Sequence, residues 1–276
     1  MNAVKEKKER KNEAAKRILF TALSACFWIG VWWLLALVVG EEWILPAPPA
    51  VVKAFFAAFE GGALPLYLLR SCAGIMAGYF AGVTVGFLLA ALTARFRALH
   101  LLFSPLLTVV RATPVASFIL ILWIFFARSA VPAASVMLIV TPIVWANCET
   151  GFLSYDRKLF EAAKAYGLSA KKKVRYLFLP AVSPYFGTAA LTALGMAWKA
   201  GVAAEVLCTP EGTIGRMIWI SKRDIITAEL FAYTAAVILV CFLFEKLFKL
   251  LFKRFGVRKR RRAPGGAAAE KGGGEA

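Results

Sequence analysis

Long apolar stretches alternate with short polar segments from residue 18 to residue 252. A helix needs about 20 mostly apolar residues to cross the hydrocarbon core of a bilayer. Six stretches meet this requirement, which predicts an all-α, polytopic membrane protein with about six transmembrane helices. The predicted spans cover residues 18–39, 68–93, 101–126, 131–152, 183–207 and 229–252.

The first span follows a basic segment, residues 1–17, and so has the flank of a secretory signal peptide. Its apolar run is longer than the usual hydrophobic region of such a peptide, and no small-residue cleavage site follows it. We therefore expect residues 18–39 to remain in the protein as a membrane anchor.

Prolines and glycines mark two further features of the first half of the chain. Pro46, Pro48 and Pro49 predict a turn after the first span, leading into a short surface helix at Lys53–Phe59. The second span carries glycines at four-residue spacing, which predicts a small-residue stripe where another helix approaches closely. These are Gly74, Gly78, Gly82 and Gly86.

The distribution of lysine and arginine predicts the orientation of the spans, because cytoplasmic loops are enriched in both. Four segments carry seven, two, seven and ten of these residues: Met1–Arg17, Ala94–His100, Leu153–Val182 and the tail from Lys246 onward. The alternate segments hold few basic residues and include Glu41, Glu42, Glu60, Glu211 and Asp224. Both termini are therefore predicted to be cytoplasmic, which requires an even number of spans.

Composition and charge agree with a membrane protein. Sixty per cent of the 276 residues are hydrophobic and only 18 per cent are charged, more apolar surface than a soluble domain of this size can hide. The net charge of +18 would suit nucleic-acid binding, but the basic residues gather at the two ends and in one interior segment. This location indicates membrane topology. We therefore predict that the chain has a lipid bilayer as a partner and does not bind nucleic acid.

The chain offers little material for catalysis. Its five cysteines show no metal-ligand spacing and His100 is the only histidine, so neither a metal site nor a catalytic triad is predicted. The sequence contains no Gly-x-x-x-x-Gly-Lys-Ser/Thr phosphate loop. We therefore predict no catalytic residue, no cofactor and no enzyme activity, and any ATP hydrolysis must occur on a separate subunit.

The most informative segment lies in the long basic loop at residues 153–182. Glu161-Ala-Ala-Lys-Ala-Tyr-Gly167 is followed, after nine residues, by Leu177-Phe-Leu-Pro180. The helix formers before Gly167 and the capping residue Ser169 predict two short helices joined at a glycine bend, the second covering 170–178 and ending before Pro180. An ordinary amphipathic loop is the alternative interpretation of these residues alone.

This spacing resembles the signature of the membrane subunits of binding-protein-dependent ABC importers, with Leu177 at a position usually held by isoleucine. The resemblance implies a type I ABC importer permease fold and a coupling helix that docks on a cytoplasmic ATPase subunit. Glu161 would make a polar contact there, while Ala162 and Ala163 allow close packing and Gly167 forms the bend. The matched residues also include Leu177, Leu179 and Pro180.

Other segments resemble the permeases of nitrate, sulfonate and taurine importers, over about residues 28–252. They are Leu45-Pro-Ala-Pro, Pro105-Leu-Leu-Thr-Val-Val-Arg-Ala-Thr-Pro114, Leu122-Trp-Ile-Phe and Ala203-Ala-Glu205. The sequence departs from the pattern at Phe126-Ala127-Arg128, where a glycine is common. The resemblance implies a homodimer in a prokaryotic plasma membrane, served by an extracytoplasmic solute-binding protein, that works by alternating access.

Ionisable residues at membrane depth are candidates for the translocation path, because burying a charge in lipid is costly. Arg111, Glu149, Lys199 and Glu205 qualify, and Trp198 could add a stacking face. Lys199 and Glu205 are offset by roughly 240° on a helix and so do not share a face. Lys199 would attract an anion, or alternatively pair with Glu149 or snorkel, and Glu205 is assigned rather to a structural or binding-protein contact.

The sequence thus predicts three parts: a basic segment at 1–17, a permease domain at 18–252, and a basic, then low-complexity and disordered tail at 253–276. A small organic or inorganic anion such as sulfonate, taurine or nitrate is the first choice of solute. A thiamine-precursor pyrimidine or riboflavin is the second. A secondary transporter is a distant alternative, because no internal repeat relates 18–126 to 131–252.

Overall fold

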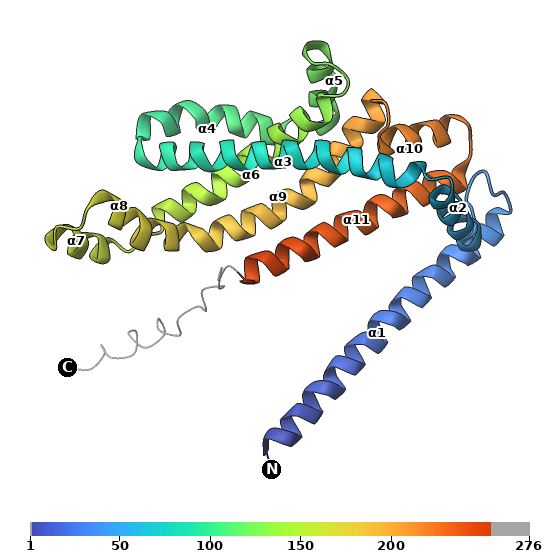
Figure 1. The fold of residues 1–276 in the computed structure, drawn as a ribbon, viewed down its shortest axis with the longest axis horizontal. Coiled ribbons are helices and arrows are strands. Elements are labelled where there is room, and N and C mark those ends of the chain that lie inside the picture. The colour runs from blue at the N-terminus through green and yellow to red at the C-terminus, as the bar shows by residue number, and fades with distance from the viewer. Residues whose placement is uncertain (1, 255–276) are drawn as a thin grey trace, which may run out of the picture. The chain divides into compact units, whose positions relative to one another are not determined.

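The computed structural model describes residues 2–254, and over this range the chain is helical with no strand. The all-α class predicted from the sequence is confirmed. Figure 1 colours the helices in chain order. They are α1 (Asn2–Val39), α2 (Pro48–Glu60), α3 (Ala63–Arg95), α4 (Arg97–Ala112), α5 (Val115–Phe125), α6 (Val131–Leu153), α7 (Arg157–Ala165), α8 (Ala170–Lys173), the π-helix η1 (Val174–Phe178), α9 (Leu179–Cys208), α10 (Ile214–Arg223) and α11 (Thr227–Arg254).

Four helical segments of the described chain are long and apolar enough to cross a membrane: Leu19–Val39, Ala63–Arg95, Val131–Leu153 and Ala170–Cys208. A fifth span is counted if the bent pair α4 and α5 is taken together. The predicted number of about six is therefore not matched in full. The predicted span 229–252 does form a helix, α11, but this helix is not among the candidate spans. The cytoplasmic placement of both termini stays a prediction.

The predicted third span is not one straight helix over 101–126. Helix α4 ends at Ala112, α5 begins at Val115, and the two are bent by 109°. Proline has no backbone N–H and disfavours the helical conformation in the residue before it. Thr113 is accordingly extended, with ψ at 135°, and Pro114 stands just before α5. The break follows from the Thr113-Pro114 pair that the sequence shows.

The described helices form two compact units. The first contains residues 1–78, 114–135 and 198–242. Its apolar core includes a cluster around Leu64, Ile214 and Tyr233 and a second cluster around Ile119, Val131 and Cys208. Helix α2 belongs to this unit and covers the short helix predicted after the prolines. Pro48 is its first residue, a position that needs no N–H donor.

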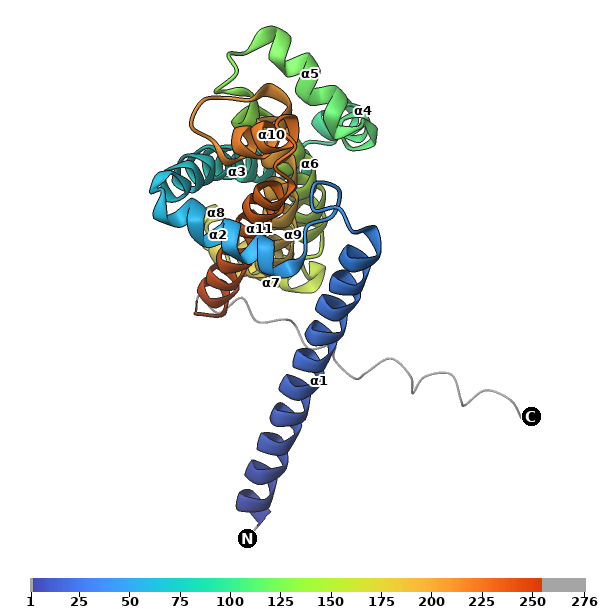
Figure 2. The ribbon, with the colours of Figure 1, turned by 90° about the vertical axis from the view of Figure 1, so that its right-hand side faces the viewer.

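Helix α1 stands out from the other elements of the first unit in both views of the fold (Figures 1 and 2). It begins at Asn2, so the predicted basic segment and first span form one continuous helix. Only 6 per cent of its apolar window is buried inside the chain. Because large apolar side chains such as Phe20, Trp28 and Leu37 are uncovered, this helix needs lipid or another protein as its surroundings.

The second unit contains residues 79–113, 136–197 and 243–276, of which the structure describes the residues up to 254. Here α3 packs closely on α6 at Gly82 and Gly86, where a Cβ atom would lie 2.9 Å and 2.6 Å from the backbone oxygens of Met137 and Thr141. The predicted small-residue stripe is confirmed at these two glycines. The predicted low-complexity tail lies outside the described residues, from 255 onward.

Candidate functional site

The predicted coupling element begins with α7, whose first turn is capped by Asp156. The Asp156 carboxylate accepts a hydrogen bond from the Lys158 backbone N–H at 2.9 Å, which satisfies one of the donors that every helix start leaves open. Along α7, Glu161 and Ala162 are exposed whereas Ala163 is buried. The helix thus keeps one alanine for its own packing and leaves a carboxylate and a small side chain accessible.

Gly167 ends this helix in the left-handed conformation, with φ at 64°. The Gly167 N–H donates to the Lys164 carbonyl and the Leu168 N–H donates to the Ala163 carbonyl, both at 3.0 Å. This pair of bonds is the Schellman motif, which satisfies the last carbonyls of a helix and turns the chain. The bend predicted at Gly167 is therefore present, and it needs a residue that tolerates positive φ.

The segment after the bend differs from the prediction. Ser169 stands before α8, but its side chain makes no capping bond. The helix does not end before Pro180; residues 170–208 run without interruption through α8, η1 and α9. A proline crowds the carbonyl four residues earlier, and the wider π turn of η1 covers that position, Tyr176. Pro180 is thus accommodated inside a helix.

Aromatic side chains hold the two arms of this element together. The rings of Tyr155, Phe160 and Phe178 lie with centroids 4.9 to 6.1 Å apart, and the Lys173 ammonium lies 5.6 Å from the Phe160 ring centroid. Leu177 and Pro180 border an adjacent cavity of about 830 Å³. Of the motif residues after the bend, Leu177 is half-buried, whereas Leu179 and Pro180 are exposed. Glu161 and Ala162 also lie on the surface, as a docking element requires.

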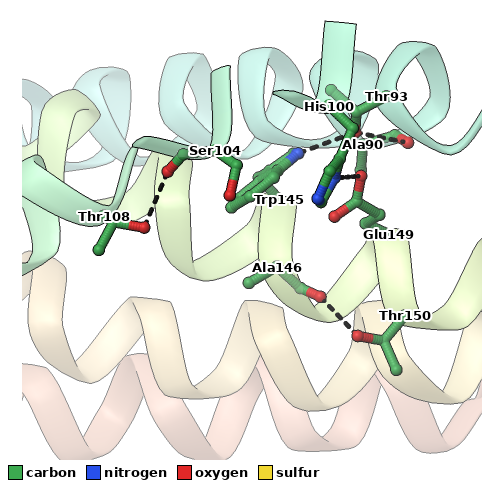
Figure 3. Close-up of polar contacts among 9 residues, drawn as sticks. All are labelled: Ala90, Thr93, His100, Ser104, Thr108, Trp145, Ala146, Glu149 and Thr150. Carbon is green, nitrogen blue, oxygen red and sulfur yellow. Dashed lines mark hydrogen bonds and ion pairs between the residues drawn. The ribbon is translucent and has the colours of Figure 1, made fainter. Parts of the chain in front are cut away.

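A second polar site joins α4 to α6 (Figure 3). The Glu149 carboxylate is buried and lies 2.9 Å from Nδ1 of His100. One turn earlier on α6, the Trp145 indole N–H donates to the Thr93 hydroxyl at 2.9 Å. The His100 and Trp145 rings lie 6.1 Å apart at 31°. The partner of Glu149 in this structure is thus His100, a residue to which the sequence interpretation gave no role.

We expect His100→Ala to lower the melting temperature of the purified protein, because Glu149 would stay buried without its partner. Leaving a buried acceptor unsatisfied costs about 1–3 kcal/mol. The measurement is thermal unfolding in detergent of His100→Ala, of Glu149→Ala and of the double variant that carries both changes. The double variant should lose less than the sum of the two single losses. Strictly additive losses would contradict a direct coupling.

Glu205 lies in a third polar site, in the first unit. Its side chain is 2 per cent exposed, and its Oε2 accepts hydrogen bonds from the Ser71 hydroxyl at 2.8 Å and the Gly215 N–H at 3.1 Å. The Ser71 oxygen in turn accepts from the Ile214 N–H at 3.0 Å. Thr213 accepts from the Arg216 N–H. These contacts supply partners for N–H groups in the first turn of α10.

The other candidate residues of the path differ in their surroundings. Trp198 is buried, with 2 per cent exposure, whereas its neighbour Lys199 is exposed in the described chain. Arg111 is exposed in the last turn of α4. The Val109 carbonyl keeps its helical hydrogen bond from the Thr113 N–H and also accepts from the Thr113 hydroxyl. Because Pro114 has no N–H, the carbonyl that loses its helical donor is that of Val110. Lys199 is therefore a candidate cation exposed on the surface of α9, while Trp198 and Glu205 are buried.

Comparison with known proteins defines the class of this helical membrane protein. Residues 82–260 match the family described as the binding-protein-dependent transport system inner membrane component. The chain belongs to this family. It is a permease subunit of an ABC importer and a multi-pass protein of the prokaryotic plasma membrane. This membership decides against the secondary-transporter alternative.

Curated relatives resemble the chain over most of its length. The nitrate import permease protein NrtB of Synechococcus elongatus is 26% identical over 223 residues, which are 76% of this chain and 78% of that protein. The putative aliphatic sulfonates transport permease protein SsuC of Bacillus subtilis is 27% identical over 238 residues, 83% of each. The taurine transport system permease protein TauC of Escherichia coli is 23% identical, covering 81% and 84%.

Solved structures support the fold. A crystal structure of an amino acid ABC transporter matches with a TM-score of 0.56 and 17% identity, covering 73% of this chain and 96% of that one. An inward-facing MetNI methionine ABC transporter matches with a TM-score of 0.56 and 15% identity, covering 71% and 97%. The predicted importer permease fold is therefore confirmed.

Proposed function

We propose that this permease works as a homodimer that carries a small anion, and that the Glu161–Gly167 element transmits the motion of a separate ATPase. The observation that carries this proposal is the geometry of α7, an exposed Glu161 and Ala162 on a helix closed by the left-handed Gly167. The short, rigid bend suits a docking element, because its internal hydrogen bonds are complete.

The anionic solute is supported by two independent considerations. Curated relatives are described as permeases for nitrate, aliphatic sulfonates and taurine, of which the first two are anions and the third carries a sulfonate group. Lys199 adds a cation on the outward face of α9, which would attract such a solute at low dielectric constant. Uptake of a pyrimidine or a flavin in place of an anion would contradict this assignment.

The homodimer is supported by the amount of apolar surface that the described chain leaves uncovered. Exposed large side chains occur on α1, α5 and α9, including Trp33, Phe125 and Met196. Lipid can cover part of this surface. A translocation path must also be surrounded by helices on every side, and one chain has few helices to do this, so a second copy would complete the path. We propose that ATP-driven closure of the ATPases draws the two coupling elements together and opens the path toward the loaded binding protein.

The test is the ATPase rate of the reconstituted complex with its binding protein, compared for wild type, Gly167→Pro and Gly167→Asn. Proline fixes φ near −65° and removes the N–H that bonds to Lys164, so it cannot adopt the observed turn. Asparagine tolerates positive φ and is the matched control. We expect Gly167→Pro to assemble but lose stimulation by the loaded binding protein, and Gly167→Asn to keep most of it.

Unchanged stimulation and uptake in Gly167→Pro would show that the loop is only a connector. A variant absent from the membrane would shift the test to Glu161→Ala, which changes an exposed side chain and leaves the bend intact. Loss of stimulation in Glu161→Ala supports docking, and full stimulation contradicts it.

A further inference from the structure

The first unit also contains a basic hollow that is separate from the sites described above. Its volume is about 560 Å³. One wall is a single face of α10, with Arg216, Trp219, Ile220 and Arg223 at the spacing i, i+3, i+4 and i+7 that places side chains on one side of a helix. The turn before α6 and the connection from α9 to α10 complete the lining. They contribute Arg128, Ser129, Thr209, Pro210 and Glu211.

The lining contains three arginines and one glutamate, which leaves an excess of positive charge. Arg216 Nη1 lies 3.1 Å from Oε1 of Glu211. Arg223 binds Asp224, just outside the hollow, with Nε at 2.7 Å and Nη2 at 3.2 Å. These hydrogen bonds lower the pKa of the Asp224 carboxyl and keep it ionised. A guanidinium has five N–H donors, so each arginine retains donors for a further ligand.

Aromatic contacts position two of the arginines. The Arg223 guanidinium carbon lies 5.2 Å from the Trp219 ring centroid, and that of Arg128 lies 5.2 Å from the Trp123 ring centroid. Stacking on a ring restricts a side chain that would otherwise be free in solvent. The connection is also held in an unusual shape, because Thr209 has φ at 49°, a conformation costly for a β-branched residue.

We propose that this arginine-lined hollow binds a small oxyanion on the extracytoplasmic side, before the anion enters the translocation path. This inference rests on the proposed function, since both concern the same class of solute. The planar fork of arginine matches the oxygens of a sulfonate, nitrate or carboxylate. The positive-inside distribution predicts that Glu211 and Asp224 lie on the extracytoplasmic side, and the hollow with them.

A small anion fits this hollow better than an acidic protein surface does. The hollow is concave, and its rim carries Glu211, whose side chain is 91 per cent exposed, next to Arg216. An extended acidic surface would meet this carboxylate and that of Asp224, and like charges in contact are unfavourable. An anion of a few atoms can instead bind the guanidinium N–H groups that these ion pairs leave free.

The experiment is calorimetric titration of methanesulfonate into the purified permease–ATPase complex, with dimethyl sulfone as the neutral analogue. We compare wild type with Arg216→Gln/Arg223→Gln and with Arg128→Gln. The matched control is Arg95→Gln, because Arg95 also stacks on an aromatic ring, Phe96, but lies in the second unit. We expect saturable binding of methanesulfonate alone, weakened by about tenfold or more in the pocket variants and unchanged in the control.

Absence of saturable binding in wild type, or equal binding in the pocket variants, would overturn the site. Pocket variants that lose stimulation by the binding protein while wild type binds no methanesulfonate would instead indicate protein docking, and would also overturn it. Should the double variant fail to fold, Arg128→Gln decides by the same criterion. Stimulation of wild type by the loaded binding protein, and its loss in Gly167→Pro, remain separate readouts of the proposed function.

Discussion

Replacement of Gly86 with leucine is expected to remove most of the folded protein from the membrane. A Cβ at this position would lie 2.6 Å from the Thr141 carbonyl oxygen, 3.0 Å from the Val144 Cβ and 3.2 Å from the Trp145 backbone nitrogen. Two of these three atoms belong to the backbone of α6 and cannot move aside without shifting the helix. Overpacking costs about 1–3 kcal/mol or more, a large part of the stability of a typical domain.

The measurement is the amount of full-length protein in the membrane fraction, followed by its melting temperature in detergent. Gly74→Leu is the matched control, because Gly74 belongs to the same four-residue series on α3 and a Cβ there would meet nothing within 4 Å. We expect the control to accumulate like wild type. Equal accumulation of both leucine variants would contradict close packing of α3 on α6.

Replacement of Glu205 with alanine is expected to destabilise the first turn of α10. The Gly215 N–H and the Ser71 hydroxyl would both lose the oxygen to which they donate, in a site that is almost inaccessible to water. Each unsatisfied buried group costs about 1–3 kcal/mol. Tryptic cleavage of the purified complex after Arg216, Lys222 and Arg223, the basic residues of α10, should accelerate accordingly.

Glu205→Gln separates the capping role from a role of the charge in transport. One oxygen of Glu205 accepts both hydrogen bonds, and the amide oxygen of glutamine can replace it. We therefore expect Glu205→Gln to resist trypsin nearly as wild type does and to support uptake. A glutamine variant that is stably folded but inactive in uptake would show that the negative charge serves the translocation path.

The features of the fold and of the candidate sites that could be predicted from the sequence are those that depend on residues close together in the chain. The Thr113-Pro114 break, the bend at Gly167 and the glycine stripe at Gly82 and Gly86 each follow from the conformational limits of proline or glycine. The importer class likewise followed from a motif of about twenty residues, because its spacing is local.

The parts that could not be predicted depend on contacts between distant segments. His100 and Glu149 are 49 residues apart, and Ser71 and Glu205 are 134 apart, so neither pair leaves a local signal. The sequence marks Glu149 and Glu205 as ionisable residues within apolar helices, and both are buried in the structure. Finding their partners requires the packing of α4 on α6 and of α3 on α9.

The π turn at Val174–Phe178 affects how the signature of this family should be searched for in other sequences. A π turn holds one residue more than an α turn, so a chain lacking one residue here could continue as a regular α-helix. The wider turn absorbs the extra residue, so the segments on either side keep about the same rotation relative to each other in both cases. A chain that held all nine residues in a regular α-helix would rotate these segments by about 100°. The nine residues between Gly167 and Leu177 therefore correspond to a helix that contains one π turn. Homologues with eight residues in this interval should form a plain α-helix, and a structure of one that retains the π turn would refute this.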